Sequence, residues 1–308
     1  MNLCAQKRAY LLLLMVFVLW GSLYVASQAV LKHVPVFTLA FLRFLIAWIF
    51  LSGMLLIRRK ASGKTMHKRT KEYKKSVLLI GLGGYAVAVG MQLLGTKLVG
   101  SSLASLLHAL NPITMTVMAA ILLKEPLAKN KILGILLAIF GVYLIVGSGQ
   151  VKSAIGVVIL LCSVVIWSLV SVMTKKGIAG YDALEITRDA LGIAVVCNLL
   201  FCLLEIVLTR PDISFTTDTA IEILYIGVCC TGLTYILWNQ CLVDLPASNC
   251  SAFYPIQPVA AAILGSIFLK EQITISFIVG TFCIAVGIIV SLLWPVIAKK
   301  QMWRVHNM

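Results

Sequence analysis

The sequence predicts an all-α integral membrane protein whose ten transmembrane helices form two inverted five-helix repeats. Three observations lead to this fold class. The chain is 61% hydrophobic and only 12% charged, and its mean hydropathy is +1.02. Its apolar runs are about 18 to 25 residues long, the length that a helix needs to cross a ~30 Å hydrocarbon core. The second half of the chain also repeats motifs of the first half.

Polar residues divide the chain into ten apolar runs, each of which we interpret as one transmembrane helix. The first run follows Lys7 and Arg8, as a secretory signal would. It continues to Val30 and contains Trp20 and Tyr24, so we interpret it as an uncleaved first helix. The predicted helices cover residues 10–30, 36–57, 76–95, 101–123, 130–148, 153–173, 184–208, 220–242, 246–269 and 273–297.

The basic residues predict how the chain crosses the membrane. A net charge of +15 is one signal of a nucleic-acid partner, but the distribution of the 26 Lys and Arg residues favours a membrane topology. With a cytoplasmic N-terminus, nineteen of them fall in inner segments and five in outer ones. We therefore expect cytoplasmic termini, a plasma or inner membrane location, and no nucleic-acid partner. Nine basic residues within 58–75 would also attract anionic lipid headgroups.

An internal repeat is visible in two matching stretches. HALNPITMTVMAAILLKE (residues 108–125) is followed 146 residues later by YPIQPVAAAILGSIFLKE (residues 254–271), with Pro112 matched by Pro258. The repeated unit is about five predicted helices long. Because five is an odd number of crossings, the second copy must enter the membrane from the opposite side.

Two inverted units follow from this count. We expect residues 1–148 to form one five-helix repeat and residues 149–308 to form the other, related by a two-fold axis in the membrane plane. Such a pair of units can adopt two similar conformations, one closed on each side of the membrane. This geometry suits alternating access to a site shared by both units.

Each copy also carries a glycine pair in its last predicted helix. Gly134 and Gly141 match Gly280 and Gly287, and the spacing places both members of a pair on one helix face. Stripes of small residues let helix backbones approach closely. We expect a packing role for both pairs.

Prolines near the middle of matching helices mark a candidate binding site. Pro112 lies ~15 Å into its predicted helix, and Pro255 and Pro258 reach a similar depth from the other side. A proline removes a backbone hydrogen bond, and the freed carbonyl then needs another partner or a wet cavity. Paired interruptions are typical of transporter sites; the alternative is that these prolines only kink helices for packing. We assign Pro112, Pro255 and Pro258 hinge or gating roles.

Polar and aromatic residues recur at helical spacing inside the predicted helices and indicate the walls of a cavity. Each residue taken alone is also explained by packing or by an interfacial aromatic belt. Arg43 is costly in lipid and could attract an anionic group, whereas Arg188 has Asp189 beside it for a local ion pair. His108 is far inside a helix and can change charge near neutral pH. We predict substrate-binding roles for Trp20, Tyr24, Arg43, Tyr85, His108, Asn111, Trp167, Tyr235, Tyr254 and Gln257.

Several chemistries lack the residues that they require. GLGGYA at residues 81–86 fits a dinucleotide-binding fingerprint, but it opens a predicted transmembrane helix instead of following a strand. The sequence shows no P-loop, no Ser/His/Asp arrangement and no metal-ligand cluster, so we expect no enzyme activity, no cofactor and no metal. No carboxylate falls near the middle of a predicted helix, which favours facilitated transport over tight ion coupling.

These residues together resemble the EamA family of the drug/metabolite transporter superfamily. LWGSLYVASQAV and LAFLRFLIA resemble its first two helices, GSSLASLLHALNPITMTVMAAILLKEPL resembles its fourth, and SNCSAFYPIQPVAAAILGSIFLKEQIT repeats the pattern. The resemblance implies a ten-helix transporter with a central cavity, often an exporter of amino acids or other small metabolites. The two Lys-Glu pairs lie at the ends of predicted helices, so we assign them capping or gating roles. The matching positions are Trp20, Arg43, Asn111, Pro112, Glu125, Pro258 and Glu271.

Taken together, the sequence favours a secondary transporter or facilitator that exports amino acids or related small metabolites by alternating access. Its partners would be a small-molecule solute and the lipid bilayer. Two alternatives stay open. One is a membrane-embedded enzyme, which would need a catalytic pair, and the other is a membrane scaffold that binds lipid or a partner and moves no solute. The sequence leaves the oligomeric state open.

Overall fold

The computed structural model describes residues 3–62, 69–123, 129–146, 153–174, 180–244 and 253–306. All regular elements in these ranges are helical, two of them π-helical (η). In chain order they are α1 (Leu3–Val30), α2 (Val36–Ser62), α3 (Lys71–Leu79), η1 (Ile80–Ala88), α4 (Val89–Val99), α5 (Ser101–His108), α6 (Asn111–Leu123), α7 (Lys129–Val146), α8 (Ala154–Thr174), α9 (Ala183–Thr209), α10 (Thr217–Gly227), η2 (Val228–Leu233), α11 (Thr234–Asp244), α13 (Ile256–Leu269) and α14 (Ile275–His306).

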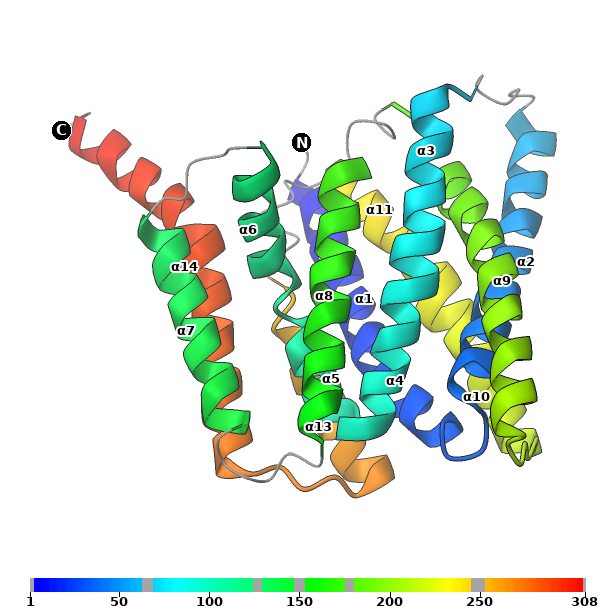
Figure 1. Cartoon of the computed structure of the whole chain (residues 1–308). Helices are drawn as coiled ribbons and strands as arrows, with labels where there is room; N and C mark the ends of the chain where they lie inside the picture. The colour runs from blue at the N-terminus through cyan, green and yellow to red at the C-terminus, as the bar shows by residue number, and fades with distance from the viewer. Residues whose placement is uncertain are drawn as a thin grey trace.

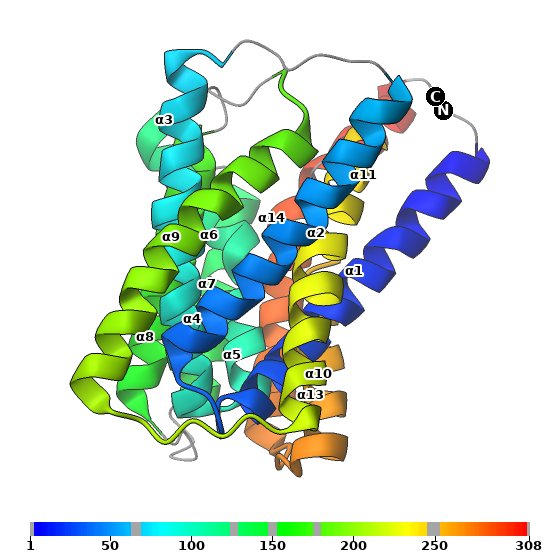
Figure 2. The same ribbon diagram turned by 90° about the vertical axis from the view of Figure 1, so that its right-hand side faces the viewer.

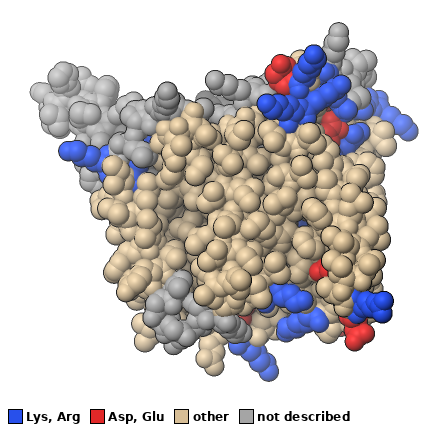
Figure 3. All heavy atoms as spheres, viewed as in Figure 1, with Lys and Arg blue, Asp and Glu red and all other residues tan. Residues whose placement is uncertain are grey.

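The helices run between two common faces (Figures 1 and 2). The chain begins and ends at one of them, which we call the terminal face, and α1 turns into α2 at the opposite one, the far face. Lys, Arg, Asp and Glu side chains gather near both faces, and a band of uncharged side chains lies between them (Figure 3). Large apolar side chains such as Ile57, Leu208 and Phe282 are exposed, as lipid contact requires.

Seven helical runs within the described residues are long and apolar enough to cross a membrane. Two further apolar helices, Ile256–Leu269 and Ile275–Val290, are shorter. The chain is therefore a multi-pass membrane protein, and the count of ten stays a prediction. The seven runs are Arg8–Val30, Val36–Lys60, Lys71–Val99, Ser101–Leu122, Ala154–Thr174, Ala183–Thr209 and Thr217–Trp238.

Three of these runs are irregular in the middle. The run of α3 and α4 contains η1, and the run of α10 and α11 contains η2. These two π-helical segments occupy matching positions in the two halves of the sequence. The run of α5 and α6 is interrupted by a turn at Ala109 and Leu110. Because π-helical turns and helix breaks disturb the regular backbone ladder, they often mark functional sites.

The structure corrects the expectation that prolines break continuous helices. Pro112 lies in the first turn of α6, after α5 has ended and the chain has turned. The Leu110 carbonyl oxygen accepts hydrogen bonds from Ile113 N (2.9 Å) and Thr114 N (3.0 Å). Likewise, Pro255 caps α13 and Pro258 lies in its first turn. Backbone N–H groups in a first turn have no intrahelical partner, so a proline there loses no hydrogen bond.

Helices from matching positions of the two halves cross antiparallel. Glu205, near the end of α9, contacts Val36 at the start of α2. Glu271, just after α13, contacts Ser101 at the start of α5. In each pair the end of one helix therefore meets the beginning of the other.

The pair α7 and α14, which stands at one edge of the molecule in Figure 1, crosses in the same sense. A Cβ added to Gly141 would lie 2.6 Å from the Gly280 carbonyl oxygen, and one added to Gly287 would lie 2.6 Å from the Gly134 carbonyl oxygen. The two predicted glycine stripes thus meet each other across one interface. Their absent side chains allow the backbone-to-backbone approach.

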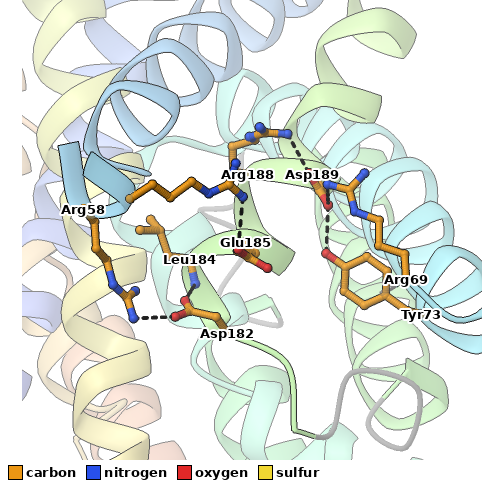
Figure 4. Close-up of polar contacts among 9 residues, drawn as sticks. Arg58, Arg69, Tyr73, Asp182, Leu184, Glu185, Arg188 and Asp189 are labelled. Carbon is orange, nitrogen blue, oxygen red and sulfur yellow. Dashed lines mark hydrogen bonds and ion pairs between the residues drawn. The ribbon is translucent and has the colours of Figure 1, made fainter. Parts of the chain in front are cut away.

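Ion pairs connect α2 to the start of α9 at the terminal face (Figure 4). Arg58 Nη2 lies 2.7 Å from Asp182 Oδ2, and Arg59 Nη2 lies 3.1 Å from Glu185 Oε1. The Asp182 side chain also caps α9 by accepting a hydrogen bond from Leu184 N at 2.8 Å.

Asp189 connects α9 to the chain entering α3 at the same face (Figure 4). Its carboxylate lies 2.7 Å from Arg69 Nη2, 2.7 Å from Arg188 Nη1 and 2.8 Å from the Tyr73 hydroxyl. The predicted local pair of Arg188 with Asp189 is confirmed. This cluster fixes how α3 and α9 meet.

Candidate solute-binding site

A cavity of about 70 Å³ lies at the depth of the interrupted helices. Its walls come from α1, α2, α4, α5 and α6 in the first half and from α8, α11, α13 and the segment leading into α13 in the second. The lining residues are Trp20, Leu23, Tyr24, Arg43, Val89, Gln92, His108, Asn111, Trp167, Tyr235, Tyr254 and Gln257. All predicted substrate-binding residues except Tyr85 belong to this lining.

The cavity is smaller than typical ligand pockets of roughly 300–1,000 Å³. It has room for little more than water in this conformation. A solute of metabolite size would therefore enter only after the surrounding helices separate.

Tyr85 packs behind the cavity lining, in an arc of aromatic rings. Ring centroids are 6.4 Å apart for Trp20 and Tyr235, 5.6 Å for Tyr235 and Tyr85, and 5.8 Å for Tyr85 and Trp167. The four rings, which we call the aromatic arc, come alternately from the first and second halves of the chain. Rings at these separations make favourable aromatic contacts, so the arc joins the two halves.

Arg43 is 2% exposed and projects from α2 into the cavity. Its Nε donates a hydrogen bond to Thr231 Oγ1 at 2.9 Å, and its Cζ lies 5.3 Å from the Phe44 ring centroid. The Thr231 hydroxyl donates in turn to the Ile226 carbonyl oxygen, five residues earlier, at 2.8 Å. The π-helical turn of η2 thereby orients the hydroxyl that holds the guanidinium group.

Two other cavity residues have defined polar roles. His108 Nε2 lies 3.3 Å from Ser163 Oγ, and the Ser163 hydroxyl donates its hydrogen to the Ala88 carbonyl oxygen at 2.8 Å. Because that hydroxyl has only one hydrogen, His108 Nε2 must be the donor to Ser163. Trp20 Nε1 donates to Thr234 Oγ1 at 3.2 Å, which ties α1 to α11.

The far-face end of α5 is held to α13 by Glu271, in a contact that we call the clasp. Glu271 Oε1 accepts hydrogen bonds from Ser101 N (2.7 Å) and Ser101 Oγ (2.8 Å), and Oε2 accepts from Ser102 N (3.0 Å) and from the Ser102 hydroxyl. A carboxylate at a helix N-terminus is stabilised by the free backbone N–H groups and by the helix dipole.

Two glycines make room for this carboxylate. A Cβ on Gly265 would lie 2.9 Å from Glu271 Oε2, and one on Gly100 would lie 3.0 Å from Glu271 Oε1. Gly100 also has a φ of 96°, which side chains rarely adopt. Glu271 therefore caps the start of α5, in agreement with the capping role that its position in the sequence indicated. Its counterpart Glu125 lies outside the described residues.

The comparisons with known proteins fit this geometry. The model of the EamA-like transporter family matches the chain twice, at residues 7–147 and at residues 154–293. The chain belongs to the EamA-like transporter family. The predicted resemblance is confirmed, and two copies of the family unit account for the matching helix breaks.

Relatives of this EamA-like chain are themselves named transporters. The uncharacterized transporter YoaV of Bacillus subtilis (strain 168) is 28% identical over 281 residues, covering 90% of this chain and 94% of the relative. The uncharacterized transporter YetK of the same organism is 27% identical, covering 96% and 89%. A solved crystal structure, 21% identical, superimposes with a TM-score of 0.65 over 94% of this chain and 97% of its own, which shows the fold alone.

The predicted substrate-binding set leaves out several residues that line or shape the site of this EamA-like protein. Gln92 and Val89 line the cavity, and Thr231 and Thr234 position Arg43 and Trp20. The two threonines lie within or next to a π-helical turn, which hydropathy and helical spacing do not reveal. Polar residues within an apolar run were the available signal.

Proposed function

We propose that this EamA-like protein is a secondary transporter or facilitator that exports amino acids or related small metabolites. The observation that carries the proposal is the cavity itself: both halves of the chain line it, and nine of the residues predicted for substrate binding meet there. Aromatic walls with a few fixed polar groups suit a small organic solute. Trp20, Tyr24, Arg43, His108, Asn111, Trp167, Tyr235, Tyr254 and Gln257 would contact it, with Tyr85 supporting the wall.

The two halves, residues 1–148 and 149–308, would form five-helix units inserted in opposite orientations. The antiparallel crossings of α2 with α9, α5 with α13 and α7 with α14 support this arrangement, because equivalent helices of two parallel units would run in the same direction. With both termini on the cytoplasmic side of the cell membrane, the far face would be the outer face.

Alternating access would open the cavity to one face at a time. The clasp would hold the far face closed, so outward release would require Glu271 to leave Ser101 and Ser102. Pro112, Pro255 and Pro258, at the starts of α6 and α13, would act as hinges beside the cavity. Both helices begin there after a break, where a change of direction costs few backbone hydrogen bonds.

Flux from proteoliposomes tests the proposed function. We expect the purified protein to release a labelled mixture of amino acids and small metabolites saturably, with and without a pH gradient. Trp20→Ala and Asn111→Ala should reduce the rate more than tenfold, whereas Gly53→Ala should not, because nothing lies within 4 Å of a Cβ at Gly53. Accumulation driven by the gradient would add proton coupling.

Two results would reject the proposal. Absence of flux for every solute class would favour a scaffold, and release of chemically altered solute would favour a membrane-embedded enzyme. Normal flux in both cavity variants would reject the cavity as the site while leaving transport intact.

A further inference from the structure

Arg43 carries the charge of the cavity wall without a counter-ion. Among the described residues that line the cavity, none is Asp, Glu or Lys. The ion pairs of the described chain lie at the terminal face, and none includes Arg43. The titratable groups around it are Tyr235, Cys230, Tyr24, Tyr85 and His108, and none of them is a carboxylate. The site therefore holds one uncompensated positive charge.

The guanidinium group is fixed and yet incompletely bonded. Nε is used by Thr231, whereas Nη1 is buried and has no hydrogen-bond partner in the described structure. A buried cation with an unsatisfied N–H group is unfavourable in a low-dielectric setting. A ligand that supplies a negative charge and a hydrogen-bond acceptor would remove this cost.

A carboxylate supplies both. Its two oxygens can accept from one edge of a guanidinium group, a geometry that is stronger and more specific than a single neutral hydrogen bond. The aromatic arc offers an apolar wall beside Arg43 for the rest of the ligand. Asn111 Oδ1, buried and also without a partner among the described residues, is a neutral acceptor for a hydroxyl or N–H group.

We propose that the solute is an organic anion with one carboxylate and an apolar body, whose carboxylate binds Arg43. This inference rests on the proposed transport function and narrows its substrate class to carboxylate metabolites, so that zwitterionic amino acids become the less favoured solutes. A monoanion makes the occupied site neutral overall. A zwitterion would leave its ammonium group uncompensated, and a cation would add a second positive charge, because the described lining offers no carboxylate.

A matched series of three solutes separates these charge states. Phenylpropionate, phenylalanine and phenethylamine share a similar aromatic body, and near neutral pH they are an anion, a zwitterion and a cation. We expect phenylpropionate to inhibit the flux of the labelled solute mixture most strongly, at a concentration at least tenfold lower than the other two compounds require. It should also raise the midpoint of thermal unfolding of the wild-type protein, whereas phenethylamine should not.

Variants of Arg43 test the contact directly. Arg43→Gln should weaken phenylpropionate binding at least tenfold, and Arg43→Lys should recover part of the loss because it keeps the charge without the planar fork. Arg188→Gln is the matched control: Arg188 is bonded to Asp189 at the terminal face and should leave binding unchanged. The wild-type thermal shift remains decisive where an Arg43 variant does not fold.

The outcomes distinguish this inference from the proposed function. Flux or stabilisation that favours phenylalanine or phenethylamine over phenylpropionate would overturn the anion assignment while transport stands. Equal phenylpropionate binding in folded Arg43→Gln and wild-type protein would do the same. If no monocarboxylate binds and no solute of the wider mixture moves, both proposals fail.

Discussion

Two of the three antiparallel helix pairs that join the halves of the molecule are tied by carboxylates, and they are tied differently. The pair α2 and α9, which we call the seam, is bonded near both faces: by Arg58–Asp182 and Arg59–Glu185 at the terminal face, and by Glu205 at the far face. The pair α5 and α13 has its described polar contact at the far face alone, through Glu271.

Glu205 and Glu271 show how similar the individual contacts are. Glu205 Oε1 and Oε2 accept from Val36 N (3.1 Å) and Phe37 N (2.9 Å), so this carboxylate also caps the start of a helix from the other half. Both carboxylates cap a helix start, although Glu271 also accepts from the Ser101 and Ser102 hydroxyls. The two helix pairs differ in the number of tied ends. Two helices tied at both faces can turn as a unit but cannot separate. Two helices tied at one face can separate at that face once the single contact breaks. We infer that the seam is the pivot of the transport cycle and the clasp its outer gate.

Cross-linking provides the largest expected effect. A Cβ at Gly265 would lie 3.0 Å from Ser101 Oγ, so Gly265→Cys with Ser101→Cys can form a disulfide across the clasp. We expect oxidation to reduce flux more than tenfold in proteoliposomes and a reductant to restore it, because the closed gate cannot part. The background should lack the other cysteines.

The seam supplies the matched control. Thr38 Oγ1 lies 3.3 Å from Cys202 Sγ, so Thr38→Cys places two thiols across α2 and α9. Oxidation of this pair should leave the flux within about twofold, since a pivot keeps these helices together. A seam cross-link that stops transport as completely as the clasp cross-link would contradict the distinction.

Removal of the two capping charges should give a several-fold effect on different observables. Glu271→Gln loses charge-assisted bonds worth about 1.5–3 kcal/mol and should shift the gate toward opening on the order of tenfold. Val89→Cys, a cavity-lining probe in a cysteine-free background, should then react faster with an impermeant thiol reagent at the far face.

Glu205→Gln should lower the midpoint of thermal unfolding instead, with little change in probe reactivity. We expect its bonds to persist when the gate opens, so their loss should destabilise the folded state as a whole. Equal reactivity of the Val89→Cys probe in the two variants would show that the carboxylates do not differ in role.

The ion-pair cluster beside the seam should affect stability more than transport. Asp189→Asn leaves Arg69 and Arg188 without their common partner and weakens the Tyr73 hydroxyl bond. We expect a loss of about 1–3 kcal/mol in the free energy of unfolding, because the two arginines are only partly buried. Denaturant titration in detergent measures this loss. The flux per folded molecule should remain near the wild-type value, and a large drop in it would place the cluster in the moving part.

Much of the site could be predicted because polar and charged side chains are energetically unfavourable inside a membrane-spanning helix. Arg43, His108 and Asn111 stand out within apolar runs, since lipid alone would not retain them. The family resemblance followed from the same residues. The glycine stripes were predictable for a related reason, because close backbone approach admits no side chain.

The contacts between the two halves could not be predicted from the amino-acid sequence alone. The prolines indicated an interrupted helix, but the interruption lies at Ala109 and Leu110, before Pro112. The π-helical turn that orients Thr231 leaves the hydropathy pattern intact. The partner of Glu271 depends on which helix start lies opposite it, and that is a property of the assembled fold.

Two glycine substitutions give the smallest expected effects and the finest test of the comparison. Gly265→Ala would place a methyl group 2.9 Å from Glu271 Oε2, and Gly192→Ala would place one 3.1 Å from Trp48 Nε1 at the seam. The first methyl displaces the gating carboxylate, so reactivity of the Val89→Cys probe should rise about two- to threefold, equivalent to roughly 0.5 kcal/mol.

The Gly192→Ala methyl should change the free energy of unfolding by less than about 1 kcal/mol, since the gain in helix propensity offsets the shift of the indole ring. Probe reactivity should then stay at the wild-type value, because the same small intrusion at a pivot opens no path to the cavity. If Gly192→Ala also raises the reactivity, α2 and α9 must separate during the cycle, and the pivot would have to be sought elsewhere, with the glycine-packed pair α7 and α14 as the next candidate.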